Sequence, residues 1–221
     1  MVKAKSIRGL YAITPNLADT EKLRRLVEAS LLGGASAIQY RNKTASHSLR
    51  ITQARALLNL CRQHNVPLII NDYIKLCLAI DADGVHLGSD DGSLAEARAQ
   101  LGEDKILGAS CYGRFELAQA AKVNGADYVA FGACFASGTK PNAANAPLAL
   151  ISRAQQELNL PIVAIGGITL DNAALVISAG ADCVAVIDAL FSSSNVQSSA
   201  QQFSQLFTQN NQYGLSQSTA V

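Results

Sequence analysis

Two carboxylates in the first half of the chain stand where a divalent cation could bind. Asp72 follows the apolar run Leu68 to Ile70, and Asp91 follows the run Gly84 to Leu87. The segment Ile74 to Ile80 between them is too short and too apolar for a surface helix, so it predicts a compact crossover between two parallel strands. Both acidic ends would then lie on the same rim of a sheet. Converging carboxylates of this kind are typical of Mg²⁺ sites, which water and substrate phosphates complete.

Each aspartate also has a purely structural explanation. Asp72 could cap the turn that begins at Ile74, because aspartate is a favoured residue at helix starts. Asp90 or Asp91 could in the same way cap a helix that begins near Ser93. Neither position alone decides between a cap and a metal ligand, so the rest of the chain has to be considered.

The composition indicates one large hydrophobic core. Of 221 residues, 49% are hydrophobic and 16% are charged, and the formal net charge is +1. No basic cluster suggests binding to nucleic acid. The apolar run from Gly9 to Thr14 is too short for the core of a signal peptide, so we predict a cytoplasmic protein without a membrane anchor.

The cysteines are five in number and lack the spacing of a zinc site. Four of them lie in or beside apolar runs, which favours small buried side chains. Cys111 differs, since it lies just after a strand-like run, on the rim that would carry the acids.

Strand-like and helical patterns alternate along the chain, with eight of each. The strand-like runs are Gly9 to Thr14, Ala37 to Tyr40, Leu68 to Ile70, Gly84 to Leu87, Ile106 to Ala109, Tyr128 to Phe131, Ile162 to Ile165 and Cys183 to Ile187. The helical segments are Glu21 to Leu32, Ser46 to His64, Ile74 to Ile80, Ser93 to Leu101, Arg114 to Val123, Pro147 to Leu158, Leu170 to Ala179 and Val196 to Gln209.

A repeated turn identifies the α/β architecture. The phrases GGASAIQY, NGADYVAF and AGADCVAV each lead from a helix into a strand, and such repetition is typical of a single (β/α)8 TIM barrel. A doubly wound sheet would require a glycine-rich fingerprint after its first strand, where this chain has Pro15-Asn16-Leu17. We therefore predict one catalytic barrel domain over residues 1–209, followed by a disordered tail over 210–221, which is rich in Gln, Ser and Asn.

Polar residues follow the predicted strands at the end where a barrel of this kind builds its active site. Gln39 and Arg41 share one face by alternation, and an inward arginine beside Lys43 indicates a bound anion unless both cations are merely solvated. Ser110 offers a hydroxyl after the fifth run. The long loop Gly132 to Asn145 is polar enough to close over a ligand, although it could also be an ordinary surface excursion.

Glycines after the seventh run complete the rim. Gly166-Gly167 could expose backbone amides to a phosphate, the site that barrels often form between their last two units, or could serve close packing alone. The rim would hold more charged and anion-binding groups than one monophosphate requires. They are two aspartates, the cations Arg41, Lys43 and Lys140, and this glycine turn. The pattern indicates a diphosphate held with Mg²⁺ together with a second phosphorylated substrate.

The motifs QYRNK, INDY, ADGVHLGSDD, GASC, SGTK, AIGGI and AVID, in this order, resemble those of the thiamine-phosphate synthase family. The resemblance covers Gly9 to about Leu190. It implies a transferase that joins 4-amino-2-methyl-5-(diphosphooxymethyl)pyrimidine to 4-methyl-5-(2-phosphoethyl)thiazole, giving thiamine monophosphate and diphosphate.

The resemblance also implies a site. Asp72 and Asp91 would bind Mg²⁺, and the residues that touch the reacting groups would be Arg41, Lys43, Ser110 and Lys140. The pyrimidine diphosphate would contact Gln39, Tyr40, Arg41, Asn42, Lys43, Asn71, Ser110 and Lys140. The thiazole phosphate would contact Ser137, Gly138, Thr139, Gly167, Ile187 and Asp188.

Some positions depart from the family pattern. Ala136 replaces a proline before the phosphate loop, Tyr112 stands where a histidine is common, and Asp188 replaces a serine beside the thiazole phosphate. An anion at Asp188 would repel that phosphate unless it turns away or the backbone amides carry the binding. A tautomerase-like paralogue and a non-catalytic phosphate-binding barrel are therefore alternatives. The family's tendency to self-associate suggests a homo-oligomer.

Overall fold

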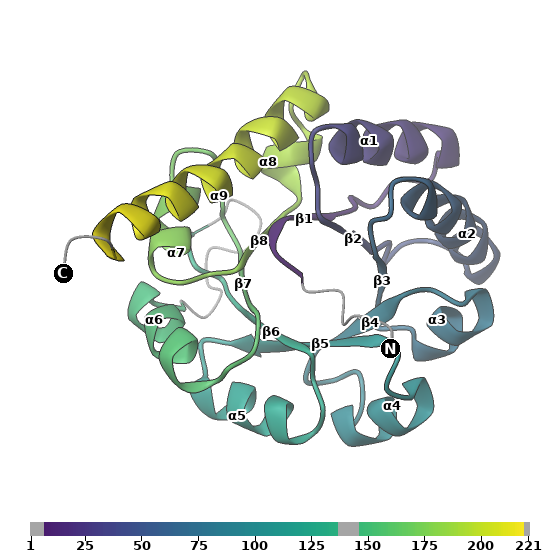
Figure 1. The fold of residues 1–221 in the computed structure, drawn as a ribbon. Helices are drawn as coiled ribbons and strands as arrows, with labels where there is room; N and C mark the ends of the chain where they lie inside the picture. The colour runs from purple at the N-terminus through teal and green to yellow at the C-terminus, as the bar shows by residue number, and fades with distance from the viewer. Residues whose placement is uncertain (1–6, 137–145, 219–221) are drawn as a thin grey trace.

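The computed structural model describes residues 7–136 and 146–218, with side chains described up to residue 208. It shows a closed barrel of parallel strands enclosed by a ring of helices, with the final helix lying across one side (Figure 1). The prediction of a single (β/α)8 TIM barrel is therefore confirmed.

Eight strands close in sequence order, each parallel to both neighbours. They are β1 (Gly9–Ile13), β2 (Ala37–Tyr40), β3 (Leu68–Asn71), β4 (Gly84–Leu87), β5 (Ile106–Tyr112), β6 (Tyr128–Phe131), β7 (Ile162–Ile165) and β8 (Cys183–Val186). The eight predicted runs match these strands within one residue at each end, except that β5 continues three residues beyond Ala109. Because the order is closed, the last strand pairs with the first, through Gly9 with Cys183.

Helices connect the strands on the outside of the barrel. They are α1 (Thr20–Leu32), α2 (His47–Gln63), α3 (Ile74–Ile80), α4 (Leu94–Leu101), α5 (Phe115–Val123), α6 (Leu148–Glu157), α7 (Ala173–Ser178), α8 (Asp188–Phe191) and α9 (Val196–Ser218). The short α8 was not predicted, and α7 is shorter than the predicted segment. Helix α9 extends beyond the predicted end at Gln209, and the domain limit at that residue stays a prediction.

Side chains alternate between two apolar layers. Along β2, Ala37 faces the barrel interior while Ile38 and Tyr40 pack in the layer between strands and helices. The interior layer also contains Tyr11 and Tyr128, whereas the outer layer is formed by branched aliphatic residues of the strands and the apolar faces of the helices. This alternation follows from the period of two along a strand. It decides which polar residue of each strand reaches the interior.

The repeated turn noted in the sequence has a common structural role. Asp83, Asp127 and Asp182 each stand directly before a strand, and their carboxylates accept a backbone N–H of the preceding strand at 2.9, 2.7 and 3.0 Å. At the equivalent place before β2, the Ser36 hydroxyl donates to the Leu10 carbonyl at 3.0 Å. These side chains join neighbouring strands at the N-terminal rim of the barrel, opposite the predicted active site.

Strand β5 contains an irregularity at the C-terminal rim. Its pairing with β6 shifts between Ser110 and Tyr112, so that Cys111 is an extra residue in the strand. Bulges of this kind re-aim neighbouring side chains and are common at barrel rims. Cys111 itself is buried, and burial raises the pKa of its thiol to about 12. All five cysteines are free and buried, so the thiol of Cys111 belongs to the core like the others.

Candidate active site

Asp72 and Asp91 meet at the C-terminal rim, as their positions after β3 and β4 predicted. Asp91 lies within hydrogen-bonding reach of the Asp72 carboxyl group. The Asp72 backbone adopts a left-handed φ of 64° while its N–H donates to the His86 carbonyl of β4 at 2.9 Å. A left-handed backbone is uncommon for residues other than glycine and is often found at functional sites. The position of Asp72 beside Asp91 therefore depends on this left-handed backbone at the end of β3 and on its hydrogen bond to β4.

Neither aspartate caps a helix. The residue at the start of α4 is Ser93, whose hydroxyl accepts from Glu96 N, and the start of α3 has no side-chain cap. Asp91 instead accepts the N–H of Gly88 at 2.8 Å, a bond within its own loop. The capping explanation is wrong for Asp72 and Asp91 alike.

The environment of Asp72 favours a bound cation. Its pKa is raised to about 6, first because the carboxyl is removed from water and then because of the hydrogen bond and negative charge of Asp91; Lys43 and Arg41 act in the opposite direction. The Lys43 Nζ lies 3.9 Å from Asp72 Oδ2. Two facing carboxylates of which one resists ionisation form an arrangement that a divalent cation would relieve.

The donor set suits magnesium in particular. Within residues 7–136 and 146–218, no cluster of three or more His, Cys, Asp or Glu side chains could enclose a metal. Asp72 and Asp91 alone would leave most coordination positions to water and substrate oxygens, which is how Mg²⁺ is commonly held beside phosphates. The residues present therefore fit that ion.

The segment after β2 divides between the rim and the outer layer. Gln39 faces the barrel interior, where its Nε2 donates to the Tyr11 hydroxyl at 2.9 Å. Tyr40 points the other way and donates to Gln53 Oε1 on α2 at 2.9 Å. Asn42 is also held by Gln53, at 3.1 Å, so its side chain stabilises the loop. For Tyr40 and Asn42, the backbone is what can face a substrate.

Arg41 and Lys43 leave this segment toward Asp72. The backbone N–H of Arg41 donates to the Thr14 hydroxyl at 2.9 Å, which anchors the loop to the end of β1. The N–H of Lys43 donates to Asn16 Oδ1 at 3.0 Å. Among the ion pairs of the described residues, Arg41 has no carboxylate partner. Lys43 has only the 3.9 Å contact with Asp72. They remain available to an anionic ligand.

Ser110 ends a set of interior polar groups that sequence analysis missed. Its Oγ lies 2.8 Å from His86 Nε2, and His86 Nδ1 lies 2.9 Å from the Tyr128 hydroxyl. Burial lowers the pKa of His86 to about 4, so the imidazole is neutral at physiological pH. The sequence feature that could have predicted this set is a histidine at an inward position of the apolar strand β4, opposite tyrosines at inward positions of β1 and β6.

Tyr112 braces the loop that carries Asp91. Its hydroxyl lies 3.1 Å from Ser89 Oγ and accepts the Ser89 N–H at 3.4 Å. The residue that replaces a common histidine therefore supports the position of the β4–α4 loop.

The glycine turn after β7 is packed tightly. Gly166 and Gly167 have φ values of 97° and 64°, and a Cβ on Gly167 would lie 2.6 Å from the Phe135 carbonyl oxygen. The nearby Thr169 N–H is already taken by Asn172 Oδ1 at 2.9 Å. Packing alone therefore explains both glycines, and their amides remain candidates for phosphate binding.

The other predicted contacts of the thiazole phosphate are only partly described. Ile187 precedes α8, and Asp188 opens that helix with an exposed side chain. Ser137, Gly138, Thr139 and Lys140 lie outside the described residues. Asn71, predicted to bind the pyrimidine, ends β3 beside Asp72 and is nearly buried.

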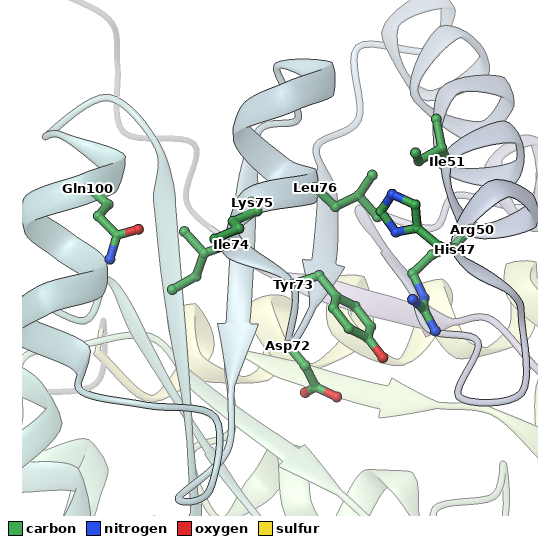
Figure 2. Close-up of a pocket in the computed structure, with 9 residues that line it drawn as sticks. All are labelled: His47, Arg50, Ile51, Asp72, Tyr73, Ile74, Lys75, Leu76 and Gln100. Carbon is green, nitrogen blue, oxygen red and sulfur yellow. The ribbon is translucent and has the colours of Figure 1, made fainter.

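A cavity of about 430 Å³ adjoins Asp72 on the helix side of the rim (Figure 2). At the edge of this cavity, the Arg50 guanidinium lies 4.0 Å from the centroid of the Tyr73 ring, over its face. The lining of this cavity comes from α2, the β3–α3 connection, α3 and α4, and comprises His47, Arg50, Ile51, Asp72, Tyr73, Ile74, Lys75, Leu76 and Gln100.

A closed parallel barrel with a carboxylate pair and cationic side chains on its C-terminal rim defines an enzyme that acts on phosphorylated small molecules. The model of the thiamine monophosphate synthase family matches residues 10–190. A thiamine-phosphate synthase of Methylobacillus flagellatus is 61% identical over 201 residues, covering 91% of this chain and 96% of that protein. One of Nitrosospira multiformis is 51% identical over 203 residues, covering 92% and 87%.

Solved structures agree. The thiamine phosphate pyrophosphorylase of Pyrococcus furiosus superposes with a TM-score of 0.83 at 31% identity, covering 94% of this chain and 98% of that one. A geranylgeranylglyceryl phosphate synthase of Thermoplasma acidophilum shares the fold, with a TM-score of 0.69 at 19% identity.

The chain belongs to the thiamine monophosphate synthase family. The resemblance seen in the motifs is thus confirmed, and the activity is that of a transferase, thiamine-phosphate synthesis. Among the helices of the described part, none is long and apolar enough to cross a membrane.

Proposed function

We propose that this rim joins the aminopyrimidine diphosphate to the thiazole phosphate, with Asp72 and Asp91 holding the Mg²⁺ that accompanies the diphosphate. The observation that carries the proposal is the facing of these two carboxylates beside Lys43. The synthase names of close relatives support the same reaction.

The bond that breaks joins the pyrimidine methylene carbon to the diphosphate oxygen, and the diphosphate leaves with the electron pair. Mg²⁺, when bound, would supply positive charge to the departing diphosphate. Arg41 and Lys43 bind its oxygens as charge develops, which is the kind of preorganised stabilisation that lowers a barrier most. Lys140 is proposed to act with them. Nothing in this step requires a side-chain nucleophile.

The methylene carbon then carries positive charge that spreads over the aminopyrimidine ring. The thiazole nitrogen donates its electron pair to this carbon and forms the new C–N bond. Gln39, Asn71 and Ser110 would orient the pyrimidine ring during the step, since all three lie at or near the ends of strands facing the rim. The contribution of the chain is to bring two bound substrates together in a productive orientation.

The second substrate would bind between β6 and β8. Gly167, Ile187 and Asp188 are the described candidates, and Ser137, Gly138 and Thr139 complete the proposed set. We also propose a cytoplasmic location, small molecules as the only substrates, no nucleic-acid partner, and a homo-oligomeric state. The biosynthetic relatives support the first two of these proposals.

Diphosphate release from purified protein tests the proposal. Both substrates are supplied with Mg²⁺, and the assay is repeated after removal of the metal with a chelator. We expect release that requires both Mg²⁺ and the thiazole phosphate. Thiazole phosphate binding without release would instead support the tautomerase-like or non-catalytic alternatives.

A further inference from the structure

A continuous chain of hydrogen bonds crosses the interior of the barrel beneath the proposed pyrimidine site. Gln39 Nε2 donates to the Tyr11 hydroxyl at 2.9 Å, and this hydroxyl lies 2.9 Å from that of Tyr128. The Tyr128 hydroxyl lies 2.9 Å from His86 Nδ1, and His86 Nε2 lies 2.8 Å from Ser110 Oγ. Five residues from β1, β2, β4, β5 and β6 are thereby connected.

The chain is shielded from water apart from Ser110. Tyr11 and Tyr128 are each 1% exposed, Gln39 is 3% exposed and His86 is 8% exposed. The ring of His86 stacks on that of Tyr128 at 5.5 Å, which holds both polar groups in place. Ser110 is the more exposed terminus. Among the described residues, neither the Ser110 hydroxyl hydrogen nor Gln39 Oε1 has another hydrogen-bond partner.

The hydrogens in such a chain must all point in the same direction. Tyr11, Tyr128 and a neutral His86 each carry one hydrogen that can take part, so each donates to one neighbour and accepts from the other. Reversing one member would place two hydrogens, or none, between a pair of buried atoms. An unpaired buried polar group is costly, so the direction is all or none.

Gln39 determines the direction because its amide nitrogen faces Tyr11. Tyr11 then donates to Tyr128, and Tyr128 donates to His86 Nδ1. The single ring hydrogen of His86 must lie on Nε2, from which it is donated to Ser110 Oγ. A protonated imidazole would carry a second ring hydrogen and oppose Tyr128. That form would force Tyr128 to donate to Tyr11, whose hydroxyl already accepts from Gln39 and would be left with an unpaired hydrogen, so the geometry requires the neutral ring.

We propose that Tyr11, Tyr128 and His86 are positioning residues that orient Ser110 as a hydrogen-bond donor and Gln39 as an acceptor toward the substrate ring. A ring bound between them must offer an unprotonated nitrogen to Ser110 and an amino group to Gln39 Oε1. A ring with an oxo group in place of the amino group offers the opposite pattern. The chain thus selects an aminopyrimidine over its oxo analogue, an inference that rests on the proposed function.

The tautomer of His86 can be measured without any substrate. The protein contains three histidines, so selective ¹⁵N labelling gives a readily assigned NMR spectrum, with His86→Gln identifying the signal. We expect the neutral form with hydrogen on Nε2 at pH 7. Hydrogen on Nδ1, or a protonated ring, would overturn the proposal whether or not the protein is active.

Substrate discrimination provides the second test. Tyr128→Phe interrupts the chain at its centre, so Ser110 can adopt either orientation. We expect the ratio of kcat/KM for the aminopyrimidine diphosphate to that for the 4-oxo analogue to fall by roughly 10-fold or more, because mismatched buried polar groups dominate such discrimination. The His86 signal of this variant should also show both neutral tautomers.

Ser30→Ala is the control for loss of a buried hydroxyl. The Ser30 hydroxyl donates to the Val27 carbonyl at 2.7 Å within α1, outside the chain of hydrogen bonds. We expect it to lower stability to a similar extent while the discrimination ratio and the His86 tautomer stay unchanged. Equal losses for both substrates in Tyr128→Phe, with the ratio preserved, would contradict the proposal. Absence of activity in the unmodified protein would contradict the proposed function instead, and the tautomer would still decide the present inference.

Discussion

Aspartates at the two rims of the barrel stand in contrasting environments. At the N-terminal rim, Asp83, Asp127 and Asp182 each accept a backbone N–H of the neighbouring strand. At the C-terminal rim, Asp72 and Asp91 face each other, and the pKa of Asp72 rises to about 6 because its carboxyl is desolvated and lies beside Asp91.

The difference separates stability from function. Carboxylates that receive backbone hydrogen bonds contribute to the closure of the barrel, and their negative charge is satisfied within the chain. Carboxylates that face one another repel, so their proximity raises the proton affinity of one of them and favours the binding of a cation. The same residue type therefore stabilises the fold at one rim and awaits a ligand at the other.

Replacing Asp72 should produce the largest effect on activity. Asp72→Asn removes one metal-binding carboxylate, and we expect kcat to fall roughly 10²–10³-fold, the loss typical for a group that stabilises developing charge. Stability to urea should stay the same or rise, because repulsion with Asp91 is relieved. Asp90→Asn, at the exposed neighbour of Asp91 in the β4–α4 loop, is the control. An unchanged rate at saturating Mg²⁺ would exclude Asp72 as a ligand.

His86 tests whether burial has its own signature, because desolvation lowers its pKa against the opposing charge of Asp91. Its folded pKa of about 4 lies below the ordinary 6.5, so its contribution to stability is complete above pH 6.5 and is lost as the pH falls toward 4. Unfolding takes up a proton in this window, which corresponds to up to about 3 kcal/mol. Urea unfolding at several pH values should show the free energy of unfolding falling as the pH is lowered from 6.5 toward 4. His86→Gln should reduce this slope. The exposed His47→Gln should retain it; a slope unaffected by His86→Gln would contradict the assignment.

Replacing Asp127 should lower stability and leave kcat unchanged, the opposite of the result expected for Asp72. Asp127→Ala removes the acceptor for the β5 N–H and a partner of Arg98. We expect the free energy of unfolding to fall by about 1–3 kcal/mol, the cost of leaving such a donor unpaired, with kcat unchanged for the folded protein. Glu103→Ala on the same side of the barrel should change stability by less than about 0.5 kcal/mol. A selective loss of kcat would break the division between the rims.

The smallest effect concerns the proposed thiazole phosphate site. Asp188 is exposed at the start of α8, where a negative charge opposes a bound phosphate. Asp188→Ser should lower the KM for the thiazole phosphate roughly 3- to 10-fold with little change in kcat. The exposed Asp171→Ser, in the neighbouring β7–α7 loop, serves as the control for a general change in surface charge. An unchanged KM would place Asp188 away from the phosphate.

The sequence by itself determined the barrel and the location of the site. Strand positions could be predicted because short apolar runs and helix-ending glycines recur with every αβ unit. Parallel strands end at one rim, so Asp72, Asp91, Arg41 and Lys43 could be placed there from their order alone. These inferences depend on local pattern and on the direction of the chain, both of which are written in neighbouring residues.

Only the tertiary structure decided which polar groups meet inside the barrel. Tyr11 and Tyr128 lie 117 residues apart, and only closure of the barrel brings their hydroxyls to 2.9 Å. The bulge in β5 likewise turned Cys111 into the core, and the bond to Gln53 turned Tyr40 away from the site. Sequence spacing carries no information about contacts across a closed barrel, because such contacts depend on the register of all eight strands together.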